Sequence, residues 1–183
     1  KEKNKKSILL EIKEIETFQA EKQKIQIAIA PTKGNDRFEW FIEKAVEIGV
    51  TDIYPFYSEF SERKRINLNR LNKIMISALK QSMRVFIPNI MPIQSFKEII
   101  ALPELKHSIS YIAHCKKDNL PLLKNKTLKH DTCIMIGPEG GFSTKEITMA
   151  TNAGWQEVSL GQYRFRTETS GIAAALTVKI IQE

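Results

Sequence analysis

The amino-acid sequence predicts an α/β protein with a parallel sheet and one ligand pocket in the C-terminal third of the chain. From residue 24 onward, short apolar runs alternate with segments of helical periodicity, which is the pattern of β-α units. Two of these runs, residues 133–136 and 158–160, end in glycine loops that open into helical patterns. Open α/β sheets bind ligands at the carboxyl ends of neighbouring strands, so two such loops indicate one shared pocket. Glycine loops are also common as simple tight turns.

Length and composition exclude several classes of protein. The chain has 183 residues, enough for one good-sized domain and a fragment, and it contains no apolar run of membrane-spanning length and no signal-peptide pattern. Two cysteines cannot form a disulfide framework, and three scattered histidines suggest no metal site. We therefore expect a reduced, cytoplasmic protein without a metal. The net charge of +7 favours a polyanionic partner.

Residues 1–22 form a highly charged first segment with one strand-like alternation at Ile8, Leu10 and Ile12. A single strand is not stable alone, so this segment is interpreted as the tail of an earlier small β domain. The chain begins without Met inside a charge run, and we expect an N-terminal portion to precede it. The main domain, 23–183, then begins with an alternating strand at residues 24–30.

A β-α-β unit follows. Apolar residues at 3.6-residue spacing between residues 33 and 53 predict a helix, with Asn35 or Asp36 as its N-cap and Gly49 as its stop. The strand Asp52–Tyr57 comes next. This order implies a parallel pair with a right-handed crossover.

The next segment is the most basic. Residues 62–73 contain five Lys or Arg residues and one acid, and an amphipathic helix runs from about residue 68 toward Pro88. Such a cluster is a candidate surface for RNA phosphates, and a solvated helix face is the plainer interpretation. No base-reading motif is present. The residues predicted to contact RNA are Arg63, Lys64, Arg65 and Arg84.

The rest of the domain is expected to contain three strands and three helices. The strands are residues 108–114, Thr132–Ile136 and 155–160, and a short helix lies within residues 91–105. Ser143 and Glu146 have capping-box spacing at the start of a helix that Gly154 ends. Thr167 is expected to cap the last helix. The predicted core face of that helix consists of Ile172, Ala175, Leu176, the Lys179 stem and Ile180.

The glycine loops match none of the common nucleotide or nucleophile motifs. They lack the G-x-G-x-x-G spacing of dinucleotide sites, the Gly-Lys-Ser/Thr of a P-loop and the G-x-S-x-G nucleophile elbow. The remaining interpretation is a site that holds a cofactor largely through backbone groups. The charged side chains near this site are Glu139, Arg164, Arg166 and Glu168.

Several motifs in these loops resemble one family. The stretch IGPEGGFSTKE (136–146), followed by the loop that ends in RTET (160–169), resembles the RsmE family. These are bacterial 16S rRNA uridine N3-methyltransferases of the SPOUT superfamily. The resemblance extends over residues 24–181, and the chain departs from the family pattern at residues 163–165. Further matching segments are 43–50, 58–64 and 81–88.

The resemblance implies a fold, a cofactor and partners. The fold would be an α/β domain whose C-terminal part, after about Asp131, forms a deep trefoil knot. Residues 1–22 would be the remnant of an N-terminal PUA-like RNA-binding domain. S-adenosylmethionine (SAM) would bind in the knot, and the protein would be a homodimer with its pockets near the subunit interface. The substrate would be one uridine of 16S rRNA in the small ribosomal subunit.

The resemblance also implies site residues. Uracil N3 carries a proton, so methylation there needs a carboxylate that removes the proton or a cation that stabilises the anion. Glu168 or Glu139 suits the first role and Arg166 the second, and we predict Arg166 and Glu168 as catalytic. Glu168 would otherwise be an acid favoured by the helix dipole, and Arg166 a clamp on the loop. The predicted cofactor-binding residues are His114, Ile136, Gly137, Gly141, Leu160, Gly161, Phe165, Arg166 and Thr167.

Two alternatives stay open at this point. The first is a SPOUT ribose 2′-O-methyltransferase that acts on tRNA. The second is a non-catalytic basic RNA-binding module whose glycine loops are only turns.

Overall fold

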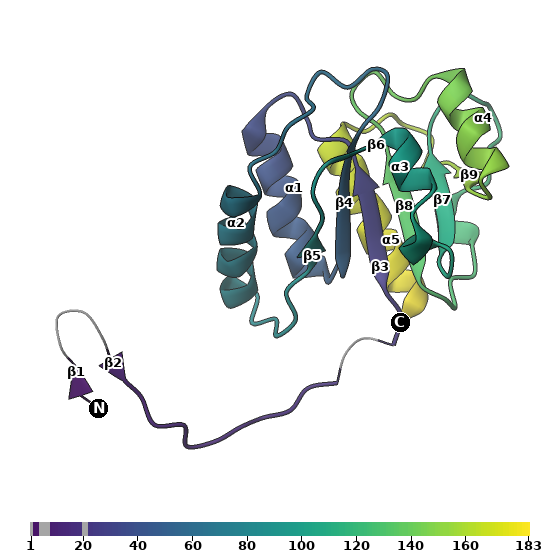
Figure 1. Cartoon of the computed structure of the whole chain (residues 1–183). Coiled ribbons are helices and arrows are strands. Elements are labelled where there is room, and N and C mark those ends of the chain that lie inside the picture. Colours follow the sequence, from purple (N-terminus) through teal and green to yellow (C-terminus); the bar gives the residue numbers. More distant parts are fainter. Residues whose placement is uncertain (1, 4–7, 20–21) are drawn as a thin grey trace.

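The computed structural model describes residues 2–3, 8–19 and 22–183 (Figure 1). In the first segment, β1 (Glu2–Lys3) and β2 (Ile8–Leu9) pair antiparallel. Residues 10–19 contain no helix or strand, so the strand predicted from the alternation through Ile12 ends at Leu9. The predicted PUA-like remnant, residues 1–22, lies partly outside the described residues.

A parallel sheet forms the centre of the main domain. Its principal strands are β3 (Ile25–Ile29), β4 (Asp52–Tyr57), β7 (Ile109–Ala113), β8 (Thr132–Ile136) and β9 (Gln156–Val158). Short strands β5 (Asn89–Ile90) and β6 (Gln94–Ser95) pair with β4. The order is β5-β4-β3-β8-β7-β9, and every pair is parallel. The predicted parallel α/β architecture is confirmed. All residues of β3 and β8 are buried, since helices cover both faces.

The helices divide between the two faces (Figure 1). On one face α1 (Asn35–Ile48) and α5 (Thr167–Gln182) pack on the sheet, and α2 (Leu68–Gln81) packs on α1. The other face carries α3 (Phe96–Ile100) and α4 (Thr144–Asn152), where the rings of Phe56, Phe96 and Phe142 pack together. Two 3-10 helices, η1 (Pro103–Leu105) and η2 (Leu123–Asn125), lie in connectors. No helix among the described residues is both long and apolar enough to cross a membrane.

The helix ends confirm some predictions and correct others. Gly49 ends α1 in a left-handed conformation with φ of 99°, and the capping box of Ser143 and Glu146 is present. The N-cap of α1 is Gly34, so the prediction of Asn35 or Asp36 was wrong by one or two positions. The N-cap of α5 is Arg166 rather than Thr167. Thr167 is instead the first residue of the helix.

The core face of α5 was predicted only in part. Ala174, Ala175 and Val178 are fully buried, whereas Leu176 and Ile180 are 46% and 63% exposed. This helix is apolar on most of its circumference, so periodicity gave no unique face. The buried side is the one with small residues, because α5 packs closely on α1: a Cβ placed on Gly171 would lie 2.6 Å from the Phe41 ring.

Candidate active site

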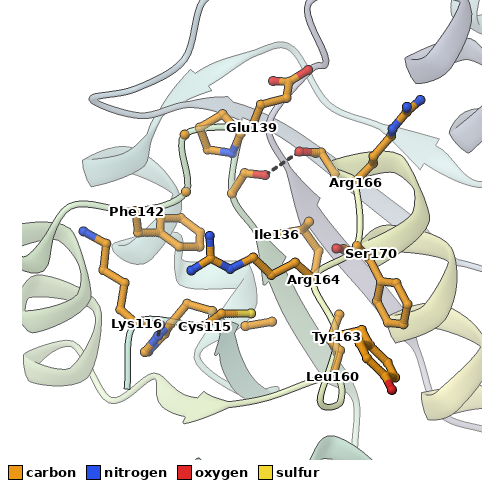
Figure 2. Close-up of a pocket in the computed structure, with 18 of the residues that line it drawn as sticks. Cys115, Lys116, Ile136, Glu139, Phe142, Leu160, Tyr163, Arg164, Arg166 and Ser170 are labelled. Atoms are coloured by element: carbon orange, nitrogen blue, oxygen red, sulfur yellow. Dashed lines mark hydrogen bonds between the residues drawn. The ribbon is translucent and has the colours of Figure 1, made fainter. Parts of the chain in front are cut away.

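A cavity of about 520 Å³ opens at the carboxyl ends of β7, β8 and β9 (Figure 2). Its walls are three loops, residues 113–116, 136–142 and 160–167, with Ser170 of α5. The two glycine loops were predicted to follow neighbouring strands, but β7 lies between β8 and β9. The loop after β7 is therefore a third wall. A cavity of this size is typical of small-molecule and cofactor sites.

The glycine loops expose their backbone to this cavity. Gly141 has φ of 70°, and its amide donates a 2.8 Å hydrogen bond to the carbonyl oxygen of Pro138. A Cβ placed on Gly141 or Gly161 would have no other atom within 4 Å. The α-carbons of both residues thus border open space, which a ligand can approach to backbone contact.

One hydrogen bond joins the loop after β8 to the start of α5. The hydroxyl of Thr167 donates to the carbonyl oxygen of Gly137 over 3.1 Å, the contact drawn as a dashed line in Figure 2. Thr167 is 4% exposed. The two glycine loops are therefore held together on the side of the cavity that faces α5.

His114, at the end of β7, is held in one tautomer. Its Nδ1 accepts a hydrogen bond from the backbone amide of Lys116 (3.2 Å), so the proton is on Nε2, which donates to Glu157 on β9 (2.9 Å). Burial lowers the pKa of His114, although the Glu157 carboxylate opposes this shift. The hydrogen bond from Lys117 to Glu157 in turn holds the pKa of that carboxyl below its ordinary value. These contacts hold the ring of His114, which lines the cavity, against β9.

The charged side chains around the cavity point in different directions (Figure 2). Arg164 extends between Lys116 and Ile136 into the cavity, whereas the guanidinium of Arg166 is turned away from it. Glu139 is also turned outward, where it accepts a hydrogen bond from the backbone amide of Lys33 (3.1 Å). Arg164 is therefore the cation best placed to meet an anionic group of a bound ligand.

Comparison with known proteins identifies the family. The family model described as "RNA methyltransferase domain" matches residues 19–179. A relative from Mesomycoplasma hyopneumoniae, named ribosomal RNA small subunit methyltransferase E, is 36% identical over 82% of this chain and 67% of its own length. The chain belongs to this RNA methyltransferase family. The resemblance found in the motifs is confirmed.

Two solved structures of the family are similar to the chain. A probable rRNA methyltransferase from Porphyromonas gingivalis is 40% identical, with a TM-score of 0.84 over 91% of this chain and 71% of its own. A ribosomal RNA small subunit methyltransferase E from Neisseria gonorrhoeae, solved with S-adenosyl methionine bound, is 32% identical, with a TM-score of 0.76 over 84% of this chain and 64% of its own. The chain thus spans about two thirds of the length of these methyltransferases.

All of the residues predicted to bind the cofactor line the cavity at the ends of β7, β8 and β9. Cys115 and Lys116 were not predicted, because the loop after β7 has no glycine motif. Phe142 was also missed, since its ring is fully buried and packs beside Gly137. The binding role of the predicted residues stays a prediction.

The predicted catalytic pair does not lie together in the cavity. Arg166 borders it, whereas Glu168 lies outside, on the side toward α1. Glu168 is 5% exposed, and its Oε2 has no hydrogen-bond partner within the part of the chain that the structure describes. Both residues border a second cavity, which shares the wall formed by residues 164–166.

The basic segment predicted to bind RNA follows Phe60, which lies beside two residues of the first cavity. A Cβ placed on Gly140 would lie 2.7 Å from the Cβ of Phe60, and the ammonium of Lys116 lies 6.0 Å from the Phe60 ring. Phe60 is separated by only two residues from the sequence Arg63-Lys64-Arg65. These three cations, named the basic rim below, therefore follow a residue that packs on the β8 loop, although none of them lines the cavity itself.

Arg84 is separated from that rim. Its guanidinium lies against Gly49, at the C-terminal end of α1, where an added Cβ would overlap the Nη2 atom. In a β-α-β unit this end of the helix lies at the amino edge of the sheet, opposite the cavity. A cation here is also favoured by the helix dipole. RNA binding by Arg84 stays a prediction without geometric support.

Proposed function

We propose that this chain is the methyltransferase domain of an enzyme that transfers a methyl group from SAM to N3 of one uridine in 16S rRNA of the small ribosomal subunit. The observation that carries the proposal is the cavity at the ends of β7, β8 and β9, bounded by both glycine loops. A relative of known structure, similar over 84% of this chain, was solved with S-adenosyl methionine bound.

The residues of the cavity fit SAM. Ile136, Leu160 and Phe142 give it apolar surface for adenine, and the open backbone at Gly141 and Gly161 offers close polar contacts. Arg164 and Lys116 provide positive charge for the carboxylate of the methionine moiety. When bound, SAM supplies a methyl group activated by a positively charged sulfur. The chain holds the two reactants in line, and positioning of this kind supplies much of the rate.

The wall formed by residues 164–166 suits the binding and deprotonation of the uracil base. It borders both cavities, so a nucleobase in the second cavity would meet the cofactor at this wall. The guanidinium of Arg166 would stabilise the uracil anion that forms when N3 loses its proton. Glu168, with its unpartnered Oε2, would accept that proton.

We propose the basic rim as the contact for the rRNA backbone. Arg63, Lys64 and Arg65 provide three cations beside the β8 loop, and Glu62, the one acid in residues 62–73, pairs with Lys33 over 2.9 Å. Phosphates bound there would guide the RNA toward the cavity.

The proposal includes the knot. The connector after β7 is hydrogen-bonded to the chain that leaves β9: the Leu123 amide donates to the Ser159 carbonyl oxygen (2.9 Å), and the Ser159 amide donates to that of Pro121 (2.9 Å). From Ser159 the chain returns to the middle of the sheet as α5, which packs on η2 and β3. A deep trefoil knot after about Asp131 accounts for this path.

We also propose an oligomeric state, a division into domains and a cellular location. The exposed apolar residues Leu176 and Ile180 lie one turn apart on α5 and suit a homodimer interface. Residues 1–22 would be the remnant of a PUA-like RNA-binding domain, and residues 23–183 the methyltransferase domain. The protein would act in the cytoplasm, where it would meet small ribosomal subunits.

A methylation assay tests the proposal. Small subunits whose 16S rRNA lacks this modification are incubated with the protein and SAM, and the RNA is digested for nucleoside mass spectrometry. We expect N3-methyluridine in 16S rRNA. Ribose methylation of tRNA would instead favour the 2′-O-methyltransferase, and RNA binding without SAM binding would favour the non-catalytic module. Either result would overturn the proposal.

A further inference from the structure

A second cavity of about 580 Å³ lies on the α1 side of the wall formed by residues 164–166. That wall borders both cavities, so a group in the second cavity lies next to whatever occupies the first. Helix α1 contributes Asp36, Arg37 and Trp40, and α5 contributes Glu168. These residues were not assigned to a common site by their sequence positions.

Two aromatic side chains border this second cavity. Trp40 and Phe165 are each 44% exposed, although large aromatic side chains bury most of their surface when a core position is available. Aromatic faces of this kind are the usual platforms on which proteins stack unpaired nucleobases. Arg37 and Arg166 add two cations, against the carboxylates of Asp36 and Glu168, and Arg164, whose guanidinium extends into the first cavity, borders the same wall.

Glu168 gives this cavity a specific hydrogen-bond acceptor. It precedes Gly171 by three residues and therefore lies on the same side of α5, the side packed on α1 at Phe41. It is 95% buried, since 5% of its surface is exposed, and its Oε2 accepts no hydrogen bond from the described residues. A buried carboxylate oxygen without a donor is costly, and a ligand that brings an N–H group removes that cost.

We propose that the second cavity binds the flipped-out uracil of the RNA substrate, stacked on Trp40, with its N3–H donating to the carboxylate of Glu168. The proposal rests on the proposed methyl transfer to uridine and names the site that holds the base. An enzyme that modifies a base inside a folded RNA must extrude it into such a pocket.

The proposed contact explains how uracil is distinguished from cytosine. Uracil N3 carries a proton and donates to a carboxylate, whereas cytosine N3 is an acceptor and faces the carboxylate with a lone pair. A site that leaves buried polar groups unpaired rejects a ligand strongly. The carboxylate of Glu168 would therefore select uracil before any chemistry takes place.

Nucleotide binding measured without SAM tests the proposal. Uridine 5′-monophosphate is titrated into the whole chain, with Trp fluorescence and the indole N–H signals in NMR spectra as readouts. Cytidine 5′-monophosphate is the matched control ligand. Of the two Trp residues, Trp155 is 4% exposed and serves as the internal reference. We expect the uridine nucleotide to quench Trp40 and shift its signal, and the cytidine nucleotide to bind at least about tenfold more weakly.

Three variants separate stacking from hydrogen bonding. Trp40→Ala should weaken uridine nucleotide binding about tenfold or more, whereas Trp40→Phe retains most of it. Glu168→Gln should bring the affinities for the two nucleotides to within about threefold, because an amide both donates and accepts. SAM affinity, measured by calorimetry, should stay unchanged in all three variants.

Three outcomes would overturn the proposal. The first is equal affinity for both nucleotides in the wild-type protein, and the second is no signal from Trp40 at millimolar uridine nucleotide. The third is a Trp40→Ala variant that changes the sedimentation of the protein but not nucleotide binding, since this face would then be an interface between two copies. Normal SAM binding and methylation alongside any of these results would leave the proposed function intact.

Discussion

The hydroxyl of Thr167 donates to the carbonyl oxygen of Gly137 across 3.1 Å and joins two loops whose residues lie 30 positions apart in the sequence. Gly137 directly follows β8, and Thr167 is the first residue of α5. The geometry of the cavity therefore depends on a contact between the two glycine loops as well as on each loop alone.

Replacement of Thr167 tests this contact. Thr167→Val keeps the shape of the side chain and removes the donor, so the carbonyl of Gly137 loses its partner at a cost of about 1 kcal/mol. We predict that SAM affinity measured by calorimetry falls about fivefold. Thr167→Ser is the control, because it keeps the hydroxyl. Equal affinities for the Val and Ser variants would contradict the proposed role.

The two arginines of the shared wall should separate binding from chemistry. Arg164 extends into the cavity and Arg166 is turned away from it (Figure 2). We predict that Arg164→Ala lowers SAM affinity at least about tenfold. Arg166→Lys should keep most SAM affinity but slow methyl transfer at least about tenfold in single turnover at saturating SAM, about 1.4 kcal/mol of barrier. A near-wild-type rate for Arg166→Lys would remove Arg166 from catalysis.

An NMR titration should report the pKa and the tautomer of His114. Burial lowers its pKa, so NMR should report neutral His114 with the proton on Nε2 at pH 6.5, the ordinary pKa of histidine. Glu157→Gln should lower that pKa further, because the carboxylate that opposes the shift is removed. A rise in the pKa of His114 in this variant would contradict the assignment.

The same shift has a consequence for stability. As the pH falls below about 6.5, the unfolded chain takes up a proton at this residue before the folded chain does. Acidification through this window should therefore destabilise the fold, and the contribution should be absent from His114→Asn. Urea unfolding of both proteins between pH 7.5 and 5.5 measures the difference.

The basic rim should account for part of the salt dependence of RNA binding. Replacement of Arg63, Lys64 and Arg65 with Ala should weaken binding and reduce the log–log salt slope by roughly 0.7–0.9 for each lost phosphate contact. The control replaces Lys24, Lys106 and Lys129, three exposed cations at the amino ends of strands, on the opposite edge of the sheet. An equal loss of slope in both triple variants would mean that RNA is attracted only by net charge.

The sequence was informative where local patterns decide structure. Strand β4 was predicted with its observed bounds, and the stop of α1 at Gly49 follows from the one residue type that adopts its left-handed backbone freely. The glycine loops pointed to the cavity because ligand sites in parallel sheets lie at strand ends.

Other features depended on long-range packing. Nothing local indicates that β7 inserts between β8 and β9, so the wall at Cys115 and Lys116 was missed. The core face of α5 is set by the close approach of Gly171 to Phe41 on another helix, which periodicity alone does not reveal. Trp40 and Glu168 meet at the second cavity for the same reason, through the packing of α1 on α5.

A calorimetric titration with SAM tests the central claim most directly when three proteins are compared. Gly141 and Gly154 both have positive φ, 70° and 92°, and a Cβ on either would meet nothing within 4 Å. Valine at either site therefore carries a similar backbone strain, about 1–2 kcal/mol, but only Gly141 borders the cavity. We predict that the wild-type protein and Gly154→Val each bind one SAM per chain, and that folded Gly141→Val, checked by circular dichroism, loses at least about tenfold in affinity. Wild-type affinity in Gly141→Val, or no SAM binding by the wild-type protein, would contradict the assignment of this cavity to the cofactor.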